Sequence, residues 1–270
     1  AAVVLVWLRR GVRDGFPVFF AALIPAAFWM YQGDLGPLLV LVGSTVLAQV
    51  LRQTVDWRWV LAVSLLVGAG FSVVLNSLLP PVMDALMVRL EPLLQNMGQS
   101  LTAPAELDAG QYKEVLPFAL LVLMPPILQI ASLLCLALGR SWQAALYNPG
   151  GLTVEFGALQ LPRWLIVVLF AGLLLLPGAG GDPRSSDVGE VLFMLGILCA
   201  VPLIAQGLAI AHGLVSQGRI QPFWLVMLYA GLLFLPPLYP LLIVLAVVDV
   251  FFNLRGIGSD RASDHRNKED

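Results

Sequence analysis

Long apolar runs separated by short polar stretches dominate this chain. The runs cover residues 16–30, 37–51, 59–79, 115–138, 164–177, 188–211 and 222–252. A helix needs about 20 apolar residues to cross the hydrocarbon core of a bilayer. The third, fourth and sixth runs reach that length. The first two are shorter and flank the turn-like YQGDLG stretch, so they predict a tight transmembrane hairpin of helices.

The last run is too long for one crossing and short for two. Pro236, Pro237 and Pro240 lie at its centre, where they would break a continuous helix. The run therefore predicts either a helical hairpin that turns at the prolines or a single kinked helix. These two topologies place the C-terminal tail on opposite sides of the membrane.

The distribution of charge favours the hairpin. If residues 9–13 are cytoplasmic and the last run is a hairpin, twelve of the 15 basic residues lie on the cytoplasmic side. The other three are Arg89, Lys113 and Arg184. Cytoplasmic loops of membrane proteins carry such an excess of Lys and Arg. We therefore expect an all-α, polytopic transmembrane bundle of about eight complete spans in the bacterial cytoplasmic (inner) membrane.

Composition supports a membrane location. The chain is 59% hydrophobic and 12% charged, whereas soluble domains carry about 25% charged residues. Its outer surface is therefore expected to face the lipid bilayer. A net charge of −2 argues against a nucleic-acid partner. Only eight residues precede Arg9, so we expect a truncated span at the N-terminus.

The expected organisation is one integral membrane domain over residues 1–255 and a disordered cytoplasmic tail over 256–270. Residues 80–114 form an extracytoplasmic segment with apolar side chains at helical spacing, from Val82 to Leu101. This amphipathic helix could be a lid over the bundle or an anchor on the membrane surface. Residues 139–163 are expected to form a cytoplasmic loop.

Motifs for catalysis and cofactors are missing from the sequence. It contains no phosphate-binding G-x-x-x-x-G-K-[ST] loop and no H-E-x-x-H motif. Cys135 and Cys199 lie singly within apolar runs, and two histidines cannot supply a histidine-rich metal site. We therefore expect no catalytic residues, no metal and no cofactor, and a protein that is not an enzyme.

Polar residues within the apolar runs are candidates for function because they are costly at membrane depth. Asp249 and Asn253 are four residues apart, on one helical face, and Arg255 follows. Asp249 is either a proton- or cation-linked carboxylate or the partner of Arg255 in a structural pair. His212, at the end of its run, either caps its helix or contacts a ligand.

Three amides complete the candidate ligand site. Asn76, Gln129 and Gln206 lie within or near expected spans. Such amides usually form hydrogen bonds between helices. The alternative is a polar cavity that these residues line together with Asp249 and Asn253, and that would bind a small solute.

The segment between residues 146 and 164 is a candidate docking site for a protein partner. Asn148, Pro149, Gly150 and Gly151 give a strong turn signal. Leu152, Phe156 and Leu159 then recur at helical spacing, with Glu155 off that stripe. We expect a short helix at the headgroups, which either only reverses the chain or recruits a partner.

Small residues mark a second candidate docking face. Ala205, Ala209 and Gly213 repeat every four residues and would let another helix approach closely. The face could contact a membrane partner or another helix of this chain.

The segments GRSWQAALYNPGGLTVEFGALQLPR, QGLAIAHGLVSQGRI and LAVVDVFFNLRG resemble the YybS-like family of bacterial polytopic membrane proteins. The resemblance covers nearly the whole chain, and its most specific part is the N-P-G-G loop with the E-F that follows. The family is distantly similar to S components of energy-coupling-factor vitamin transporters. The resemblance implies that this protein is a small-solute binding or transport component without its own ATPase. The alternative is a membrane scaffold or assembly factor that recruits partners through its cytoplasmic loops.

Overall fold

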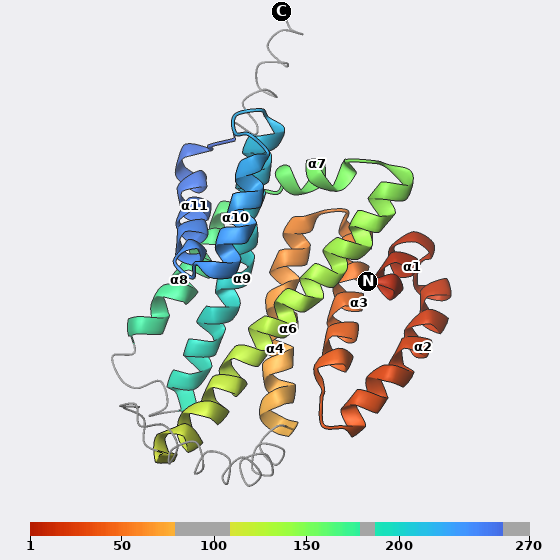
Figure 1. Ribbon diagram of the computed structural model, residues 1–270, viewed down its shortest axis with the longest axis vertical. Coiled ribbons are helices and arrows are strands. Elements are labelled where there is room, and N and C mark those ends of the chain that lie inside the picture. Colours follow the sequence, from red (N-terminus) through yellow and green to blue (C-terminus); the bar gives the residue numbers. More distant parts are fainter. Residues whose placement is uncertain (79–108, 179–186, 256–270) are drawn as a thin grey trace, which may run out of the picture.

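The computed structural model describes residues 1–78, 109–178 and 187–255, and all regular structure in these residues is helical (Figure 1). The expected all-α class is therefore confirmed. The helices are α1 (Ala2–Arg10), α2 (Val12–Tyr31), α3 (Gly36–Thr54), α4 (Trp57–Leu78), α6 (Ala109–Tyr147), α7 (Gly151–Gly157), α8 (Arg163–Gly178), α9 (Asp187–Ser216), α10 (Phe223–Phe234) and α11 (Leu238–Phe252).

Five of the described helices are long and apolar enough to cross a membrane. They are α2, α3, α4, residues 119–147 of α6 and residues 189–216 of α9. Three further apolar helices are shorter: residues 163–174 of α8, α10 and α11. The fold is that of a helical membrane protein, and the count of eight complete spans stays a prediction.

Small residues let the central helices approach one another. A side chain at Gly43 of α3 would meet the ring of Phe71 from α4 at 2.5 Å, and one at Gly68 of α4 would meet Leu198 from α9 at 2.7 Å. The main hydrophobic core extends from Val4 of α1 to Ile243 of α11, with Leu136 and Leu203 fully buried. This closely packed core holds the helices in fixed positions relative to one another.

One end of the bundle is basic. The segments around α7, the connection between α3 and α4 and the C-terminal ends of α9 and α11 lie in the upper half of Figure 1, and α1 with its connection to α2 lies on the right, below α7. Contacts join these segments: the guanidinium of Arg9 lies 4.5 Å from the ring centroid of Tyr147. We call this the basic end, and its arginines are Arg9, Arg10, Arg13, Arg52, Arg58, Arg140, Arg163, Arg219 and Arg255.

The last apolar run breaks at its prolines, as the sequence predicts. Pro236 and Pro237 separate α10 from α11, and the hydroxyl of Tyr239 donates a hydrogen bond to the carbonyl oxygen of Leu232 across the turn (2.8 Å). The helices have 12 and 15 residues, or about 18 and 22 Å at 1.5 Å per residue. Both are shorter than the hydrocarbon core of about 30 Å.

The hairpin returns the chain to the basic end. Arg219, just before α10, donates from Nη1 to the carbonyl oxygen of Leu254, just after α11 (2.7 Å). In Figure 1 the two helices lie beside the upper part of α9, nearest the basic end. The hairpin therefore enters the bundle from the basic end and leaves it there.

Some sequence predictions fall on residues that the structure leaves undescribed. Most of the expected amphipathic segment 80–114 and the whole tail 256–270 lie outside the described residues, as does the choice between a lid and an anchor. Residues 109–114 belong to the start of α6. The expected loop 139–163 contains the last part of α6, the whole of α7 and the connection to α8.

Candidate functional site

A buried ion pair closes the end of α11. The guanidinium of Arg255 lies 3.0 Å from Oδ2 of Asp249, and the two side chains are 0% and 2% exposed. Asn253 ends α11 in the left-handed conformation (φ 44°), which turns the chain so that Arg255 comes back over the helix end. Leu254 donates its N–H to Oδ1 of Asp249 (2.9 Å). Of the two sequence interpretations of Asp249, the pair with Arg255 is confirmed.

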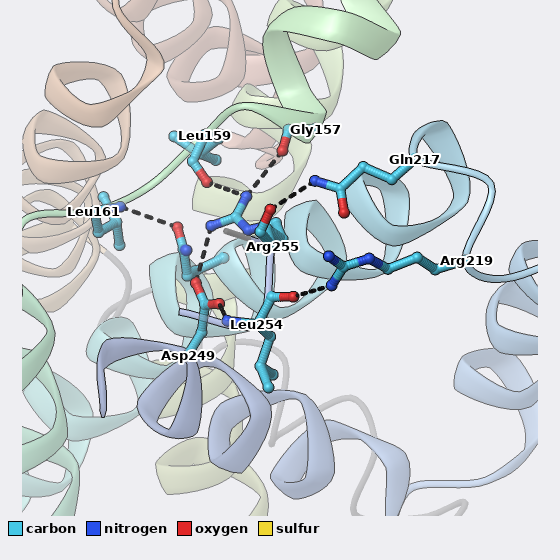
Figure 2. Close-up of polar contacts among 9 residues, drawn as sticks. Gly157, Leu159, Leu161, Gln217, Arg219, Asp249, Leu254 and Arg255 are labelled. Atoms are coloured by element: carbon cyan, nitrogen blue, oxygen red, sulfur yellow. Dashed lines mark hydrogen bonds and ion pairs between the residues drawn. The ribbon is translucent and has the colours of Figure 1, made fainter. Parts of the chain in front are cut away.

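Arg255 also holds the connection between α7 and α8 (Figure 2). Its Nη1 donates to the carbonyl oxygens of Gly157 (2.9 Å) and Leu159 (2.6 Å). Buried carbonyl groups need such donors, because an unsatisfied one costs free energy. One buried arginine therefore links the end of α11 to a connection almost 100 residues earlier in the chain.

Gln206 and Gly213 of α9 complete this contact. Oε1 of the fully buried Gln206 accepts a hydrogen bond from the N–H of Leu161 (3.2 Å). A side chain at Gly213 would lie 2.8 Å from the carbonyl oxygen of Gly157 and 2.7 Å from Cδ of Arg255. The connection can pack this close to α9 only because position 213 has no side chain.

The other two candidate amides lie apart from this network. Gln129 is fully buried in α6 and donates from Nε2 to Oγ of Ser64 in α4 (3.1 Å). Asn76 is exposed near the end of α4 that lies farthest from the basic end. Neither of the two cavities described below is lined by Asn76, Gln129 or Gln206.

An apolar groove lies between α6, α7, α9 and the α10–α11 hairpin. Its volume is about 470 Å³, within the range of about 300–1,000 Å³ typical of small-molecule sites. Exposed side chains at its rim, such as Ile130, Leu134 and Tyr229, show that it opens on the surface of the bundle. Its lining includes Trp57, Leu61, Leu133, Ala137, Leu152, Phe156, Val201, Ile204, Ala205, Leu208 and Leu232.

Two polar side chains meet in this apolar groove. Nε2 of His212 lies 2.8 Å from the hydroxyl of Tyr229, a hydrogen bond between α9 and α10. The ring of Phe156 packs edge-on against the imidazole, with the ring centroids 5.5 Å apart. Two further hydroxyl groups in the lining belong to Thr153 of α7 and Tyr239 of α11, and the Tyr239 hydroxyl donates to the carbonyl oxygen of Leu232 (2.8 Å). The groove thus offers a long, mainly apolar surface with a few polar groups, an arrangement that suits a largely apolar molecule.

A second, smaller cavity of about 240 Å³ lies at the basic end. Asp249 and Asn253, predicted to share one helical face, both line it, together with Arg58, Gln160 and Arg163. The described structure therefore brings two of the five candidate ligand residues to one cavity. Gln206 lies nearby in the Arg255 network, while Asn76 and Gln129 are elsewhere.

Helix α7 is held against the bundle by polar contacts of Glu155 and by apolar packing. Arg140 of α6 donates to both carboxylate oxygens of Glu155, and Nε1 of Trp57 lies 3.4 Å from Oε2 of the same residue. Leu159 is buried, and Leu152 and Phe156 are partly buried against the core. The short helix expected here is present as α7, with Leu159 just after its end. The apolar stripe packs on the core of the bundle and not toward the headgroups, where the sequence places the helix.

Replacing both Phe156 and Leu159 with Ser should release this segment. Burying such side chains contributes up to about 1.5–3 kcal/mol each. We therefore expect amide hydrogen exchange across residues 150–162 to become roughly tenfold to a hundredfold faster, with exchange in α4, α6 and α9 unchanged. Val154→Ser is the matched control, because that side chain is exposed. Unchanged exchange in the double variant would show that the segment is not held by this stripe.

The candidate docking residues fall into two groups. Asn148, Pro149 and Gly150 are exposed, whereas Gly151 is buried and Glu155 and Phe156 are engaged in the contacts above. On α9, Ala209 and Gly213 are buried within this chain, and Ala205 lines the apolar groove. The exposed turn is thus the part of the predicted docking site that is open to a partner, and docking itself stays a prediction.

The sequence identifies part of each cavity lining, namely His212 and Phe156 in the groove and Asp249 and Asn253 in the small cavity. Nothing in the sequence indicates Tyr229, because its pairing with His212 depends on the packing of α10 against α9. Arg58 and Arg163 were counted only as positive charge. One sequence feature could have indicated the small cavity. Arg58 and Arg163 each directly precede an apolar run, at 59–79 and 164–177, and both runs are expected to begin on the same side of the membrane.

No family model, curated protein or solved structure matches this chain.

Proposed function

We propose that the protein is a membrane-embedded binding component for a small, largely apolar molecule. The observation that carries the proposal is the groove of about 470 Å³. Its rim includes the exposed side chains of Ile130 and Leu134 on α6, which would contact lipid tails in a membrane, and Tyr229 on α10. A ligand would therefore enter sideways from the bilayer and bury its apolar part. Its polar group would bind the His212–Tyr229 pair.

This function agrees with the solute-binding role that the family resemblance implies. The chain has no phosphate-binding loop of the common type, so energy for any transport step would come from a partner. Gln129 and Gln206 form buried hydrogen bonds and Asn76 is exposed, so none of these three amides lines either of the two cavities described above. We therefore propose an apolar ligand in place of the polar solute considered from the sequence.

Filling the groove should reduce the amount of bound ligand. Ala205 lines it, and an Ala205→Trp side chain would occupy part of the space that the ligand needs. We expect the small molecule that co-purifies in mild detergent to fall about tenfold, since overfilling a packed site costs about 1–3 kcal/mol. Mass spectrometry of the extracted protein measures it.

Ala171→Trp is the matched control for this experiment, because Ala171 is exposed on α8 and lies outside the groove. Tyr229→Phe tests the polar end: it keeps the shape and removes the hydroxyl, so the loss should be about fivefold, the value of one hydrogen bond. Binding in the groove would be contradicted if the same amount of small molecule co-purified with the wild type, with Ala205→Trp and with Ala171→Trp.

The orientation of the bundle is part of the proposal. With the basic end in the cytoplasm, the positive-inside preference is met by nine arginines. A fluorescent reporter fused after residue 256 should therefore be active on the cytoplasmic side, and a phosphatase inserted within residues 98–110 should be active outside. An extracytoplasmic tail would contradict this orientation and the hairpin of the last run.

A scaffold function is the second candidate, and the exposed turn favours it. Asn148, Pro149 and Gly150 project from the basic end, and Val154 on the outer side of α7 is 68% exposed. Such a surface could bind a cytoplasmic protein. If a partner co-purifies and is lost with Val154→Asp while the small molecule is retained, the scaffold role would be favoured over ligand binding.

A further inference from the structure

The small cavity at the basic end is enclosed by three segments that are far apart in sequence. They are the start of α4, the connection leading into α8, and the end of α11. Its polar lining comes from Arg58, Gln160, Arg163, Asp249 and Asn253. Its residues are all different from those of the apolar groove. The cavity is therefore a separate site, and its ligand does not depend on the function proposed above.

Two guanidinium groups lie at the rim of this cavity, and the positive charge comes mainly from Arg163, because Arg58 is paired with Asp56. Arg58 binds Oδ2 of Asp56 through Nε (2.8 Å), which leaves its two terminal amino groups outside that contact. Arg163 is exposed, and among residues 1–78, 109–178 and 187–255 its side chain has no hydrogen bond or ion pair. An arginine that the fold does not use internally is available for an external anion.

The carboxylate of Asp249 does not cancel this positive rim. Oδ2 is paired with Arg255 at 3.0 Å, and Oδ1 accepts the N–H of Leu254. The charge of Asp249 is thus neutralised within the fold.

Backbone groups add to the positive character of the cavity. Arg163 and Trp164 begin α8, and the first N–H groups of a helix have no acceptor within the helix. Together with the two arginines, they would favour a phosphate group at the start of α8.

The depth of the cavity in the membrane indicates where such a phosphate would come from. Trp59 and Trp164, each next to one of the two arginines, are 56% and 63% exposed. Exposed tryptophans gather at the level of the lipid headgroups. Val167 and Val168, one turn further along α8, are exposed where lipid tails would begin. The cavity therefore lies level with the phosphates of one leaflet.

We propose that this cavity binds the phosphate of an anionic phospholipid from the leaflet at the basic end. Arg163 would make the main ionic contact, Arg58 the second, and Gln160 and Asn253 would lie beside the headgroup. A volume of about 240 Å³ suits a headgroup better than a whole ligand. Basic pockets between membrane helices bind lipid headgroups in this manner.

Native mass spectrometry of the full chain tests the proposal. The protein is purified in detergent, titrated with phosphatidylglycerol, and compared with the same protein titrated with phosphatidylcholine. We expect a phosphatidylglycerol adduct of defined stoichiometry that phosphatidylcholine does not match. Arg163→Gln and Arg58→Gln should each weaken the adduct about fivefold, and the double variant about 25-fold.

Arg10→Gln is the matched control, because Arg10 is an exposed arginine at the basic end that does not line the cavity. It should change the adduct less than twofold. With a non-ionic detergent the micelle surface carries no charge, so a general loss of positive charge should have little effect. If Arg58→Gln unfolds the protein, Arg163→Gln carries the test alone, because within the described residues the Arg163 side chain has no hydrogen bond or ion pair to lose.

Three results would overturn the proposal. The Arg163→Gln protein could bind phosphatidylglycerol as well as the wild type does. The control variant could lose as much binding as the cavity variants. Inorganic phosphate at millimolar concentration could displace the lipid, which would assign the cavity to a free phosphate ion. None of these results bears on the apolar groove, whose ligand is measured independently with Ala205→Trp.

Discussion

Replacing Arg255 with Met should lower the free energy of unfolding by about 3–5 kcal/mol, the cost of breaking a buried ion pair by removing one partner. The substitution leaves the carboxylate of Asp249 buried without its cation. It also removes the donor to the carbonyl oxygens of Gly157 and Leu159. The midpoint of unfolding in detergent, by heat or by added dodecyl sulfate, measures the loss.

Arg219→Met is the control for this result. Arg219 is exposed and makes one hydrogen bond to the carbonyl oxygen of Leu254, so its loss should cost about 1 kcal/mol or less. The double variant Asp249→Leu with Arg255→Met removes both charges and should be more stable than Arg255→Met alone. If the free energy of unfolding of Arg255→Met lies within about 1 kcal/mol of the wild-type value, the pair does not hold the end of α11.

Gly207→Ala should destabilise the contact between α9 and α11 by about 1–3 kcal/mol, the usual cost of overfilling a packed core. A methyl group at position 207 would lie 2.4 Å from the carbonyl oxygen of Leu242. That atom belongs to the backbone of α11, so a side-chain rotation cannot relieve the overlap. The hairpin would have to move away from α9.

Gly70→Ala is the control, and its expected change in stability has the opposite sign. Gly70 is exposed within α4, and nothing lies within 4 Å of the position its side chain would take. Alanine is a better helix former than glycine by about 1 kcal/mol, so this variant should be slightly stabilised. The same unfolding midpoints compare the two. A Gly207→Ala protein at least as stable as Gly70→Ala would contradict the close packing of α9 on α11.

The sequence predicts those features that depend on neighbouring residues. The apolar runs gave the helices, and the prolines gave the break between α10 and α11. Asp249 and Arg255 are six residues apart, so their pairing could be expected from the chain alone. Each of these features follows from local spacing, because backbone geometry and short-range electrostatics determine it.

Features that join distant segments could not be predicted in this way. Arg255 binds the carbonyl oxygen of Gly157, 98 residues away, and nothing near either residue indicates the other. The repeat Ala205, Ala209 and Gly213 predicts a face for close helix packing, and in this fold Gly213 contacts Gly157 of the same chain. Small residues permit close approach by any backbone, so the repeat alone cannot identify its partner.

The apolar groove depends most strongly on tertiary structure. Its walls come from α4, α6, α7, α9 and the α10–α11 hairpin, and most of the side chains that they contribute look like ordinary span residues in the sequence. The hydrophobic pattern cannot tell a side chain that packs on another helix from one that lines a groove, since both are apolar. The sequence indicates His212 as a candidate, but its place in the groove depends on its contacts with Tyr229 and Phe156.

Photo-crosslinking from within the groove tests the central claim most directly. A photoreactive benzoylphenylalanine replaces Leu208, which lines the groove, or Leu138, which is exposed on α6 outside it. Crosslinked molecules are then identified by mass after irradiation in native membranes. We predict one discrete small-molecule adduct at position 208 and a mixture of bilayer phospholipids at position 138. The same phospholipid mixture at both positions would contradict a ligand-binding groove.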